Sequence, residues 1–477
     1  MTAVRFACAG CGWAPPDAEP HPVRCANAVA GDDVDHVVVR RLDPAGIEWP
    51  PAGGANPFVR YRTLLSSYHA ATDRGMTDAE YVDLVERLDK EVAAVDGRGF
   101  EITPFARNVR LSDRLGFSAG GGVWVKDETG NVSGSHKARH LFGLLLHLSV
   151  IDETGAGGNR TNPPELAVAS CGNAALAAAL VAKAAGRTSR VFVPAWADPV
   201  IVDRLASLDA LVDVCQREPG VSGDPTLRAL RMAVANGAAY PFTCQGTENG
   251  LAIEGGQTLA YEMADGMREA GTPLDRVLIQ VGGGALASAA IAGFGEARAL
   301  GAVDRMPAFF AVQSRGGYPL KRAHDAVVAR IVARIESETG AVPPPPGDEP
   351  GRARFIREWH SSPAIREELA HAAHHRSEFM WPWEVEPASV ATGILDDETY
   401  DWLAVVRGMI DTAGHPVVVE EETLLRANEL AVTATGIEVD HTGSSGLAGL
   451  MELLDRGEVD RDERIAVLFT GARRPVR

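Results

Sequence analysis

Two segments of this chain repeat the same order: an apolar run, a tight glycine-containing turn and an alanine-rich stretch. The first runs from residues 166–169 through Gly172 into 174–185, and the second from 277–281 through the glycines 282–284. A short apolar run followed by such a turn and a helical stretch predicts a buried strand that leads into a helix. From about residue 100 onward, strands and helical stretches alternate, as in parallel sheets covered by helices. The expected fold class is therefore α/β with parallel sheets.

One lysine lies on a Ser/Gly-rich turn directly before a strongly apolar, helix-like run. It is Lys137, within residues 131–139. A lysine amine is nucleophilic only after it loses its proton, and a partly desolvated position near a helix N-terminus disfavours the charged form. The same helix start leaves backbone N–H groups free for an anion. Lys137 is therefore a candidate Schiff-base lysine that holds pyridoxal phosphate.

Three further features lie at the ends of predicted strands, where ligands of open α/β sheets collect. Asn173 opens a helical stretch, so its side chain either caps that helix or points its amide at a cofactor ring oxygen. The glycines 282–284 expose consecutive N–H groups to a phosphate. Thr470 closes the last apolar strand, residues 465–469, where its hydroxyl can donate to a neutral pyridine nitrogen.

Together these residues resemble the fold-type II pyridoxal-phosphate (PLP) enzymes, the tryptophan synthase β-like superfamily that includes threonine synthase and the serine/threonine ammonia-lyases. Further segments match in the order of that family. Residues 101–105 resemble its TPL motif, 125–128 its KDE strand and 254–258 its EGxxT helix start. The resemblance spans residues 100–475. It implies two parallel-sheet, three-layer α/β domains and PLP as the cofactor.

The resemblance also implies a role for each of these residues. Lys137 is the catalytic lysine that carries the cofactor, and Asn173 contacts the phenolic oxygen. Thr470 faces the pyridine nitrogen, and the phosphate is cradled by Gly282, Gly283, Gly284 and Ala285. The expected substrate contacts are Ser135, Arg139 and Ser170.

The motif around the lysine is a hybrid: His136 resembles the residue found in tryptophan synthase β chains, while Arg139 occurs in both synthases and ammonia-lyases. His136 and Ala138 stand where threonine synthases usually have Phe and Asp, whereas the three glycines at 282–284 resemble the ammonia-lyase loop. The leading expectation is a threonine-synthase-like lyase that converts O-phosphohomoserine to threonine and phosphate. The alternative is a serine/threonine-type ammonia-lyase, which forms a 2-oxo acid and ammonia. The departures at 136 and 138 also leave open a non-catalytic PLP-binding scaffold.

Cysteines near the N-terminus form a separate motif. Cys8 and Cys11 are a CxxC pair, whose thiolates can hold two corners of a zinc tetrahedron, and Cys25 supplies a third. His36 is the expected fourth ligand because it opens an apolar run, whereas His21 sits between two prolines. Some threonine synthases carry a comparable zinc ribbon. Zinc binding and a degenerate, metal-free knuckle remain as alternatives.

The pattern divides the chain into regions. We expect residues 1–45 to form the cysteine knuckle, 46–100 a linker and helical segment, and 101–477 the catalytic region. Within the last region, 140–250 is the expected smaller, mobile domain, and 335–380 is an expected insertion. Relatives of this kind are commonly homodimers, so a homodimer is expected.

The net charge, the apolar runs and the cysteine content limit the kinds of partner and the compartment that we expect. The formal net charge of −18 argues against nucleic acid. The sequence contains no apolar run of about 18 residues and no signal-peptide pattern, so no membrane association is expected. Six cysteines in 477 residues do not form a disulfide framework. We therefore expect a cytoplasmic enzyme whose substrate is a small amino acid.

Overall fold

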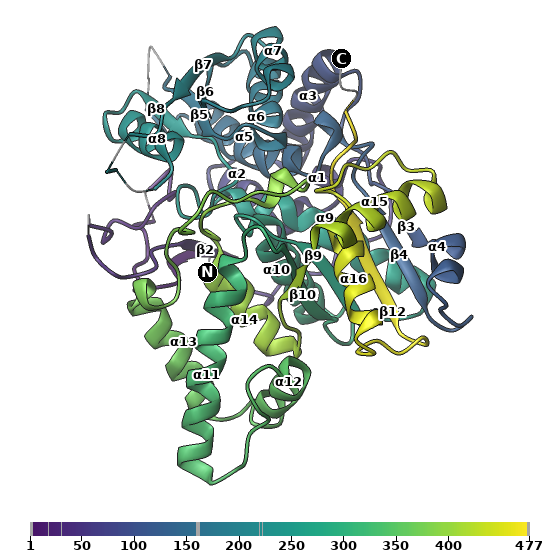
Figure 1. Cartoon of the computed structure of the whole chain (residues 1–477). Helices are drawn as coiled ribbons and strands as arrows, with labels where there is room; N and C mark the ends of the chain where they lie inside the picture. Colours follow the sequence, from purple (N-terminus) through teal and green to yellow (C-terminus); the bar gives the residue numbers. More distant parts are fainter. Residues whose placement is uncertain are drawn as a thin grey trace.

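A computed structural model of the chain shows three sheets with helices packed around them (Figure 1). It describes residues 3–17, 19–29, 31–158, 163–218, 220–221 and 223–474. Within these ranges, none of the helices combines the length and the apolar character needed to cross a bilayer.

A six-stranded sheet forms the centre of the larger part of the molecule. Its strands lie in the order β11 (Val417–Val419), β10 (Ala308–Ser314), β9 (Arg276–Gln280), β12 (Arg464–Phe469), β4 (Gly122–Asp127) and β3 (Phe105–Arg107). Neighbouring strands are parallel except β3 and β4, which are antiparallel. Because β9 and β12 are parallel neighbours, the residues that follow them lie at the same edge of the sheet.

Successive residues of these strands enter two separate cores. Val277 and Ile279 pack against α9 (Ala252–Ala270), α10 (Ala285–Ala299) and α14 (Trp402–Thr412). Leu278 packs on the opposite face, which carries α4 (Val109–Arg114), α15 (Glu421–Thr435) and α16 (Ser445–Asp455). Since both faces are covered by helices, the central positions of the strands are mainly apolar and do not alternate with polar residues.

A four-stranded sheet forms the second α/β unit. Its strands are all parallel and lie in the order β7 (Leu211–Cys215), β6 (Ser189–Pro194), β5 (Glu165–Ala169) and β8 (Ala239–Pro241). One face packs against α5 (Lys137–Glu153), α6 (Asn173–Ala184) and α7 (Pro199–Ser207), and the other against α8 (Pro225–Ala235). The predicted class, with two parallel-sheet α/β units of three layers, is confirmed.

Helix α5 carries apolar residues on all its sides because most of its length is buried. It crosses α9 at a contact between glycines: a β-carbon on Gly143 would lie 2.9 Å from the Gly255 Cα. A β-carbon on Gly255 would in turn overlap the carbonyl oxygen of Arg139. Only glycine allows the two backbones to approach this closely.

The N-terminal region is a small unit placed against these sheets. Strands β1 (Val4–Cys8) and β2 (Val38–Leu42) form an antiparallel pair. The chain continues through α1 (Pro57–Arg60), η1 (Arg62–Leu64), α2 (Ser66–Asp73) and α3 (Asp78–Asp96). Thr77 and Glu80 form a capping box that fixes the start of α3.

The predicted insertion at 335–380 is largely helical. It holds the end of α11 (Pro319–Thr339) together with α12 (Glu349–Glu358), α13 (Pro363–His374) and η3 (Arg376–Glu378), which extend below the sheets in Figure 1. The chain then returns to the six-stranded sheet through residues 390–401, which we call the strap and which contain η4 (Thr392–Ile394). The domain boundaries expected from the sequence stay predictions.

Candidate active site

Lys137 is the first residue of α5 and is half-buried. The chain enters the helix through an extended Ser135, which forms a β-bridge with Gly471. The next N–H, that of His136, donates to the Thr470 carbonyl over 3.2 Å. The lysine is therefore held beside the carboxyl end of β12.

The Thr470 hydroxyl contacts a residue that the sequence analysis missed. Gln280 ends the neighbouring strand β9, and its Nε2 donates to Thr470 Oγ1 over 2.6 Å. Because the hydroxyl accepts this hydrogen bond, its own hydrogen is available to a ligand. The sequence signal for Gln280 is a polar residue at the end of an otherwise apolar strand.

Asn173 begins α6 and reaches the same place from the smaller α/β unit. The N-cap of α6 is Gly172, without a side-chain hydrogen bond, so the capping role is not the one observed. A β-carbon on Gly471 would lie 2.8 Å from Asn173 Nδ2 and 2.9 Å from an oxygen of Asp440. Within the described part of the chain, Asn173 Oδ1 is buried without a partner. Its carbonyl oxygen is thus available to a ligand.

The loop between β9 and α10 is formed by three glycines. Gly284 is the N-cap of α10 and has a φ of 95°, in the left-handed region that favours glycine. Gly282 and Gly283 precede it, and their β-carbons would collide with neighbouring side chains. Because the loop has no side chains, other groups can approach its backbone closely, as an anion site at a helix N-terminus requires.

The strap covers this loop. Thr399 Oγ1 donates to the Gly282 carbonyl over 2.9 Å, and the Asp401 N–H donates to the Gly283 carbonyl over 3.0 Å. A β-carbon on Gly283 would lie 2.8 Å from the ring of Tyr400. That ring also packs with residues of the four-stranded sheet, so the strap contacts both α/β units.

Carboxyl groups with raised pKa values surround Lys137 and Asn173. Burial raises the pKa of Asp396 to about 6, although the Lys137 charge and a hydrogen bond from the Gly283 N–H lower it. Burial likewise raises the pKa of Asp401 to about 7 and that of Asp440 to about 6. Burial thus favours the neutral form of each of these carboxyl groups, none of which was identified from the sequence.

Two histidines next to Lys137 are neutral. Burial, with the nearby Lys137 charge, holds the pKa of His136 well below its usual range. The same two causes lower the pKa of His140 to about 3. The His136 ring lies 3.2 Å from the Thr470 carbonyl through Nδ1, so the residue helps to position the turn before the lysine.

Arg139 does not face the site, and the expectation that it contacts the substrate is wrong. Its guanidinium is fully buried and pairs with Glu128 and Glu262, with further hydrogen bonds to Thr103 and Thr258. All three of its nitrogens are engaged, which leaves no donor for a substrate anion. The cluster also contains Lys126, paired with Glu262. Arg139 therefore ties the start of α5 to β4 and α9.

The two serines that are expected to contact the substrate differ in their burial and in their hydrogen bonds. Ser135 is fully buried, and its Oγ has no partner among the described residues. Ser170 is half-buried, and its Oγ accepts from the Gly172 N–H over 3.4 Å. The structure thus places Ser135, Lys137, Thr470 and Asn173 close together, with Ser170 on the turn that precedes Asn173, while Arg139 is buried in a separate ion-pair cluster.

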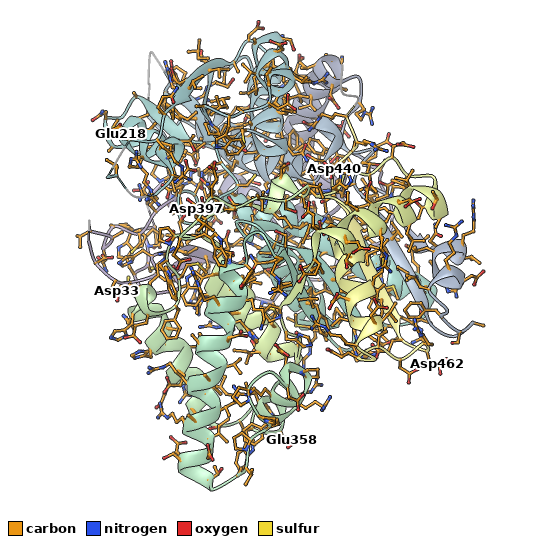
Figure 2. The ribbon with its side chains drawn as sticks, in the orientation of Figure 1. Asp33, Glu218, Glu358, Asp397, Asp440 and Asp462 are labelled. Carbon is orange, nitrogen blue, oxygen red and sulfur yellow. The ribbon has the colours of Figure 1, made fainter. Side chains whose placement is uncertain are left out.

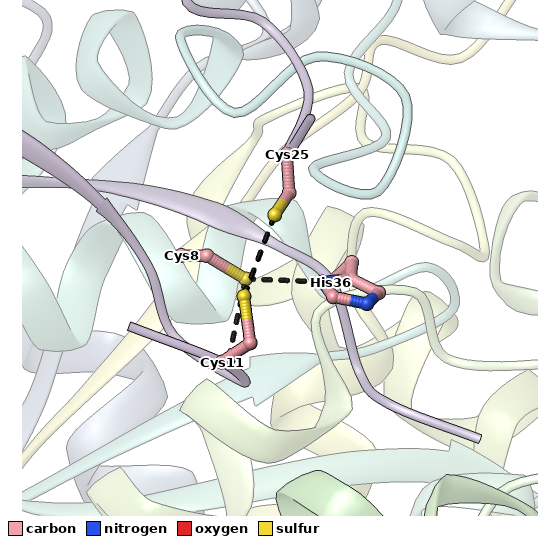
Figure 3. A group of neighbouring side chains, drawn as sticks. All are labelled: Cys8, Cys11, Cys25 and His36. Carbon is pink, nitrogen blue, oxygen red and sulfur yellow. Dashed lines mark hydrogen bonds between the residues drawn. The ribbon is translucent and has the colours of Figure 1, made fainter. Parts of the chain in front are cut away.

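The four expected metal ligands of the knuckle also come together (Figure 3). The ligand atoms of Cys8, Cys11, Cys25 and His36 all lie within 4.8 Å of one another. Cys8 Sγ is 3.5 Å from His36 Nδ1, and Cys11 Sγ is 3.5 Å from Cys25 Sγ. Tetrahedral zinc with ordinary bond lengths separates its sulfur and nitrogen ligands by about 3.4–3.8 Å. The second ring nitrogen of His36 lies 3.1 Å from Asp32.

Comparison with known proteins agrees with this geometry. The family profile described as pyridoxal-phosphate dependent enzyme matches residues 98–359, more than half of the chain. A threonine synthase of Methanocaldococcus jannaschii is 23% identical over 369 residues, which cover 77% of this chain and 74% of that protein. A biosynthetic L-threonine dehydratase of Haemophilus influenzae is 26% identical over 215 residues, 44% of this chain and 36% of that protein. A crystal structure of a threonine deaminase from T.th., 20% identical, matches with a TM-score of 0.52 over 82% of this chain and 99% of that one.

Two α/β sheets that meet at a half-buried lysine, an asparagine and a glycine loop define the fold-type II class of PLP enzymes. This chain belongs to the family of pyridoxal-phosphate dependent enzymes. The residues present fit that cofactor, because Ser135 Oγ, Asn173 Oδ1 and Gln280 Oε1 are buried without partners in the described structure. The Thr470 hydroxyl and the glycine loop add a donor and an anion cradle.

Proposed function

We propose that the protein is a PLP-dependent lyase that acts on a small amino acid by elimination. The observation that carries this proposal is the position of Lys137, half-buried at a helix start beside Thr470, Asn173 and the glycine loop. Lys137 Nζ would hold the cofactor covalently and, once released, remove the α-proton of the substrate. When bound, PLP supplies an electron sink for the negative charge that forms at the substrate Cα.

The hydroxyl group of Thr470 influences which type of reaction the site favours. A hydroxyl at the pyridine nitrogen donates a hydrogen bond without protonating the ring, whereas a carboxylate would keep it charged. The electron sink is then weaker, which favours prompt loss of a leaving group over long-lived carbanion chemistry. Gln280 supports this role because it holds the hydroxyl oxygen and leaves its hydrogen free.

The specific reaction proposed is that of a threonine synthase, with O-phosphohomoserine as substrate. Threonine synthases are the relatives that align over about three quarters of the chain. A new candidate for the substrate phosphate replaces Arg139. Arg474 is half-buried, donates from Nη2 to the Ser133 carbonyl over 3.2 Å, and lies within electrostatic reach of Asp440. It therefore sits against the loop that leads into Lys137.

A serine/threonine-type ammonia-lyase is the second candidate. Asp396 and Asp401 lie within electrostatic reach of Lys137, and Asp440 contacts Asn173; carboxylates at these positions disfavour a doubly charged phosphate. Loss of a β-hydroxyl from L-serine or L-threonine makes no such demand on the site.

The first experiment is an absorption spectrum of the purified protein before and after borohydride, followed by peptide mapping. We expect the reduced cofactor on Lys137 and no label in Lys137→Ala. Phosphate and threonine formed from O-phosphohomoserine would identify a synthase, and a 2-oxo acid with ammonia formed from L-threonine an ammonia-lyase. Cofactor attachment with no turnover of either substrate would indicate a non-catalytic scaffold and contradict the proposal.

We also propose that the knuckle binds one Zn²⁺. The proposal rests on the ligand separations and on Asp32, because a carboxylate on the second ring nitrogen is the usual outer partner of a zinc-bound histidine. Metal analysis of the purified protein should find one zinc per chain, lost in Cys11→Ser. Protein purified with zinc in the medium but free of bound metal would support the degenerate alternative instead.

A further inference from the structure

The strap places a carboxylate on the glycine loop. The Asp396 carboxylate lies against the loop, because a β-carbon on Gly282 would collide with its Oδ2, and the nearby Gly283 N–H lowers its pKa. Lys137 is close enough for its charge to act on Asp396. An anion from the chain itself therefore stands at the N-terminus of α10, in the position that the proposed function gives to the cofactor phosphate.

The contact is held by anchors on both sides. Toward the loop, Thr399 and Asp401 hydrogen-bond to the carbonyls of Gly282 and Gly283. On the outer side, Glu398 pairs with Arg376 over 3.1 Å and the Gly393 N–H donates to Thr442 Oγ1 over 3.0 Å. These contacts hold the strap across the glycine loop. Within residues 390–401, η4 is the only regular element.

Two anions cannot share one backbone donor at low cost. A phosphate monoester carries up to two charges at neutral pH, and its approach to an ionised carboxylate in a partly desolvated site is repulsive. Burial already disfavours the charged form of Asp396 in the absence of any ligand. Binding of a phosphate therefore requires that the Asp396 carboxylate leave the loop or take up a proton.

On the basis of the proposed function, we infer that the Asp396 carboxylate competes with the cofactor phosphate. The carboxylate occupies the glycine loop until PLP displaces it. In the cofactor-free chain the Asp396 carboxylate lies against the glycine loop, and its negative charge interacts favourably with Lys137. Displacement of the carboxylate makes the N–H groups of the glycine loop available to the phosphate. The strap therefore controls binding of the cofactor.

The test compares Asp396→Asn with Asp397→Asn as the matched control. Asp397, labelled in Figure 2, is the next residue of the strap, and its carboxylate pairs with Arg217 over 3.4 Å. PLP binding is followed by absorbance in a stopped-flow instrument, and pyridoxal, which lacks the phosphate, is the second probe. We expect Asp396→Asn to bind PLP about tenfold more tightly, to bind pyridoxal as the wild type does, and Asp397→Asn to change neither.

Two other outcomes of these binding experiments would overturn the inference. Unchanged or weaker PLP binding by Asp396→Asn would show that the carboxylate does not compete with phosphate. An equal gain for pyridoxal would show a general opening of the strap. If no form of the protein binds PLP, the proposed function fails, and the inference is then decided by thermal stabilisation with inorganic phosphate, which should be larger in Asp396→Asn than in the wild type.

Discussion

The side-chain amide of Gln280 and the hydroxyl of Thr470 meet over 2.6 Å at the ends of two adjacent parallel strands. Neither strand alone would create this pair. The amide can only donate through Nε2, so the hydroxyl is fixed as the acceptor and its hydrogen points elsewhere. The pair therefore presents the free hydroxyl hydrogen of Thr470 as a donor and Gln280 Oε1 as an acceptor, and it carries no charge.

Removing that donor should weaken cofactor binding. Thr470→Val keeps the shape of the side chain but leaves the Gln280 amide without this acceptor, and we expect PLP affinity to fall about tenfold. Thr470→Ser retains the hydroxyl and should bind nearly as the wild type does. Equilibrium titration of PLP by absorbance measures both, and equal affinity for Val and Ser would refute the role given to the hydroxyl.

Substitution of Arg139 should affect stability and not substrate binding. Arg139→Met leaves Glu128 and Glu262 with only Lys126 to balance them in a fully buried cluster. The expected loss is about 3–5 kcal/mol in the free energy of unfolding, measured with urea. Arg110→Met, at an exposed arginine, is the control and should cost little. A normal stability with a raised KM would instead restore Arg139 to the substrate site.

Stability should depend on pH through Asp401. Its pKa is raised by burial from an ordinary value of 3.8 to about 7, so the folded chain holds a proton that the unfolded chain has lost. The stabilisation is present below about pH 4 and is lost as the pH rises toward about 7. Asp401→Asn mimics the protonated form and should be more stable than the wild type by about 1–3 kcal/mol near pH 8.

That difference should shrink as the pH falls toward about 4, where both side chains are uncharged. Cofactor-free protein is unfolded with urea at several pH values to measure it. A constant difference across the range would mean that Asp401 does not titrate as described.

Arg474 distinguishes the two candidate substrates. Arg474→Met should raise KM for O-phosphohomoserine about tenfold or more, because a charge-assisted contact with phosphate is lost, and leave KM for L-threonine unchanged. The neighbouring Arg473, which is exposed, provides the control as Arg473→Met. Equal effects on both substrates would place Arg474 outside the phosphate contact.

Asp32 should tune the metal site without being a ligand. Asp32→Asn keeps Cys8, Cys11, Cys25 and His36 but weakens the partner of the His36 ring. We expect about tenfold weaker zinc binding, measured by competition with a chromophoric chelator. His36→Ala removes a ligand and should have a larger effect. An Asp32→Asn protein with unchanged affinity would argue against His36 as a ligand.

Sequence patterns predicted the elements that depend on local signals. The local positions of Lys137, on a turn before a helix, and of Asn173 and the glycine loop, after strands, agree with the structure, because an apolar run next to a turn is a local signal. Arg139 was misplaced because its partner Glu262 lies 123 positions away on another helix. Asp396 belongs to an acidic run without periodicity, and nothing in that run indicates a contact with Gly283.

The crossing of α5 and α9 has a mechanical consequence. Gly143 and Gly255 bring the two helices into backbone contact, and Arg139 joins the start of α5 to both β4 and α9. Lys137 thus shares the frame of the six-stranded sheet, although α5 also covers the four-stranded one. These contacts oppose any shift of the Lys137 amine relative to the six-stranded sheet.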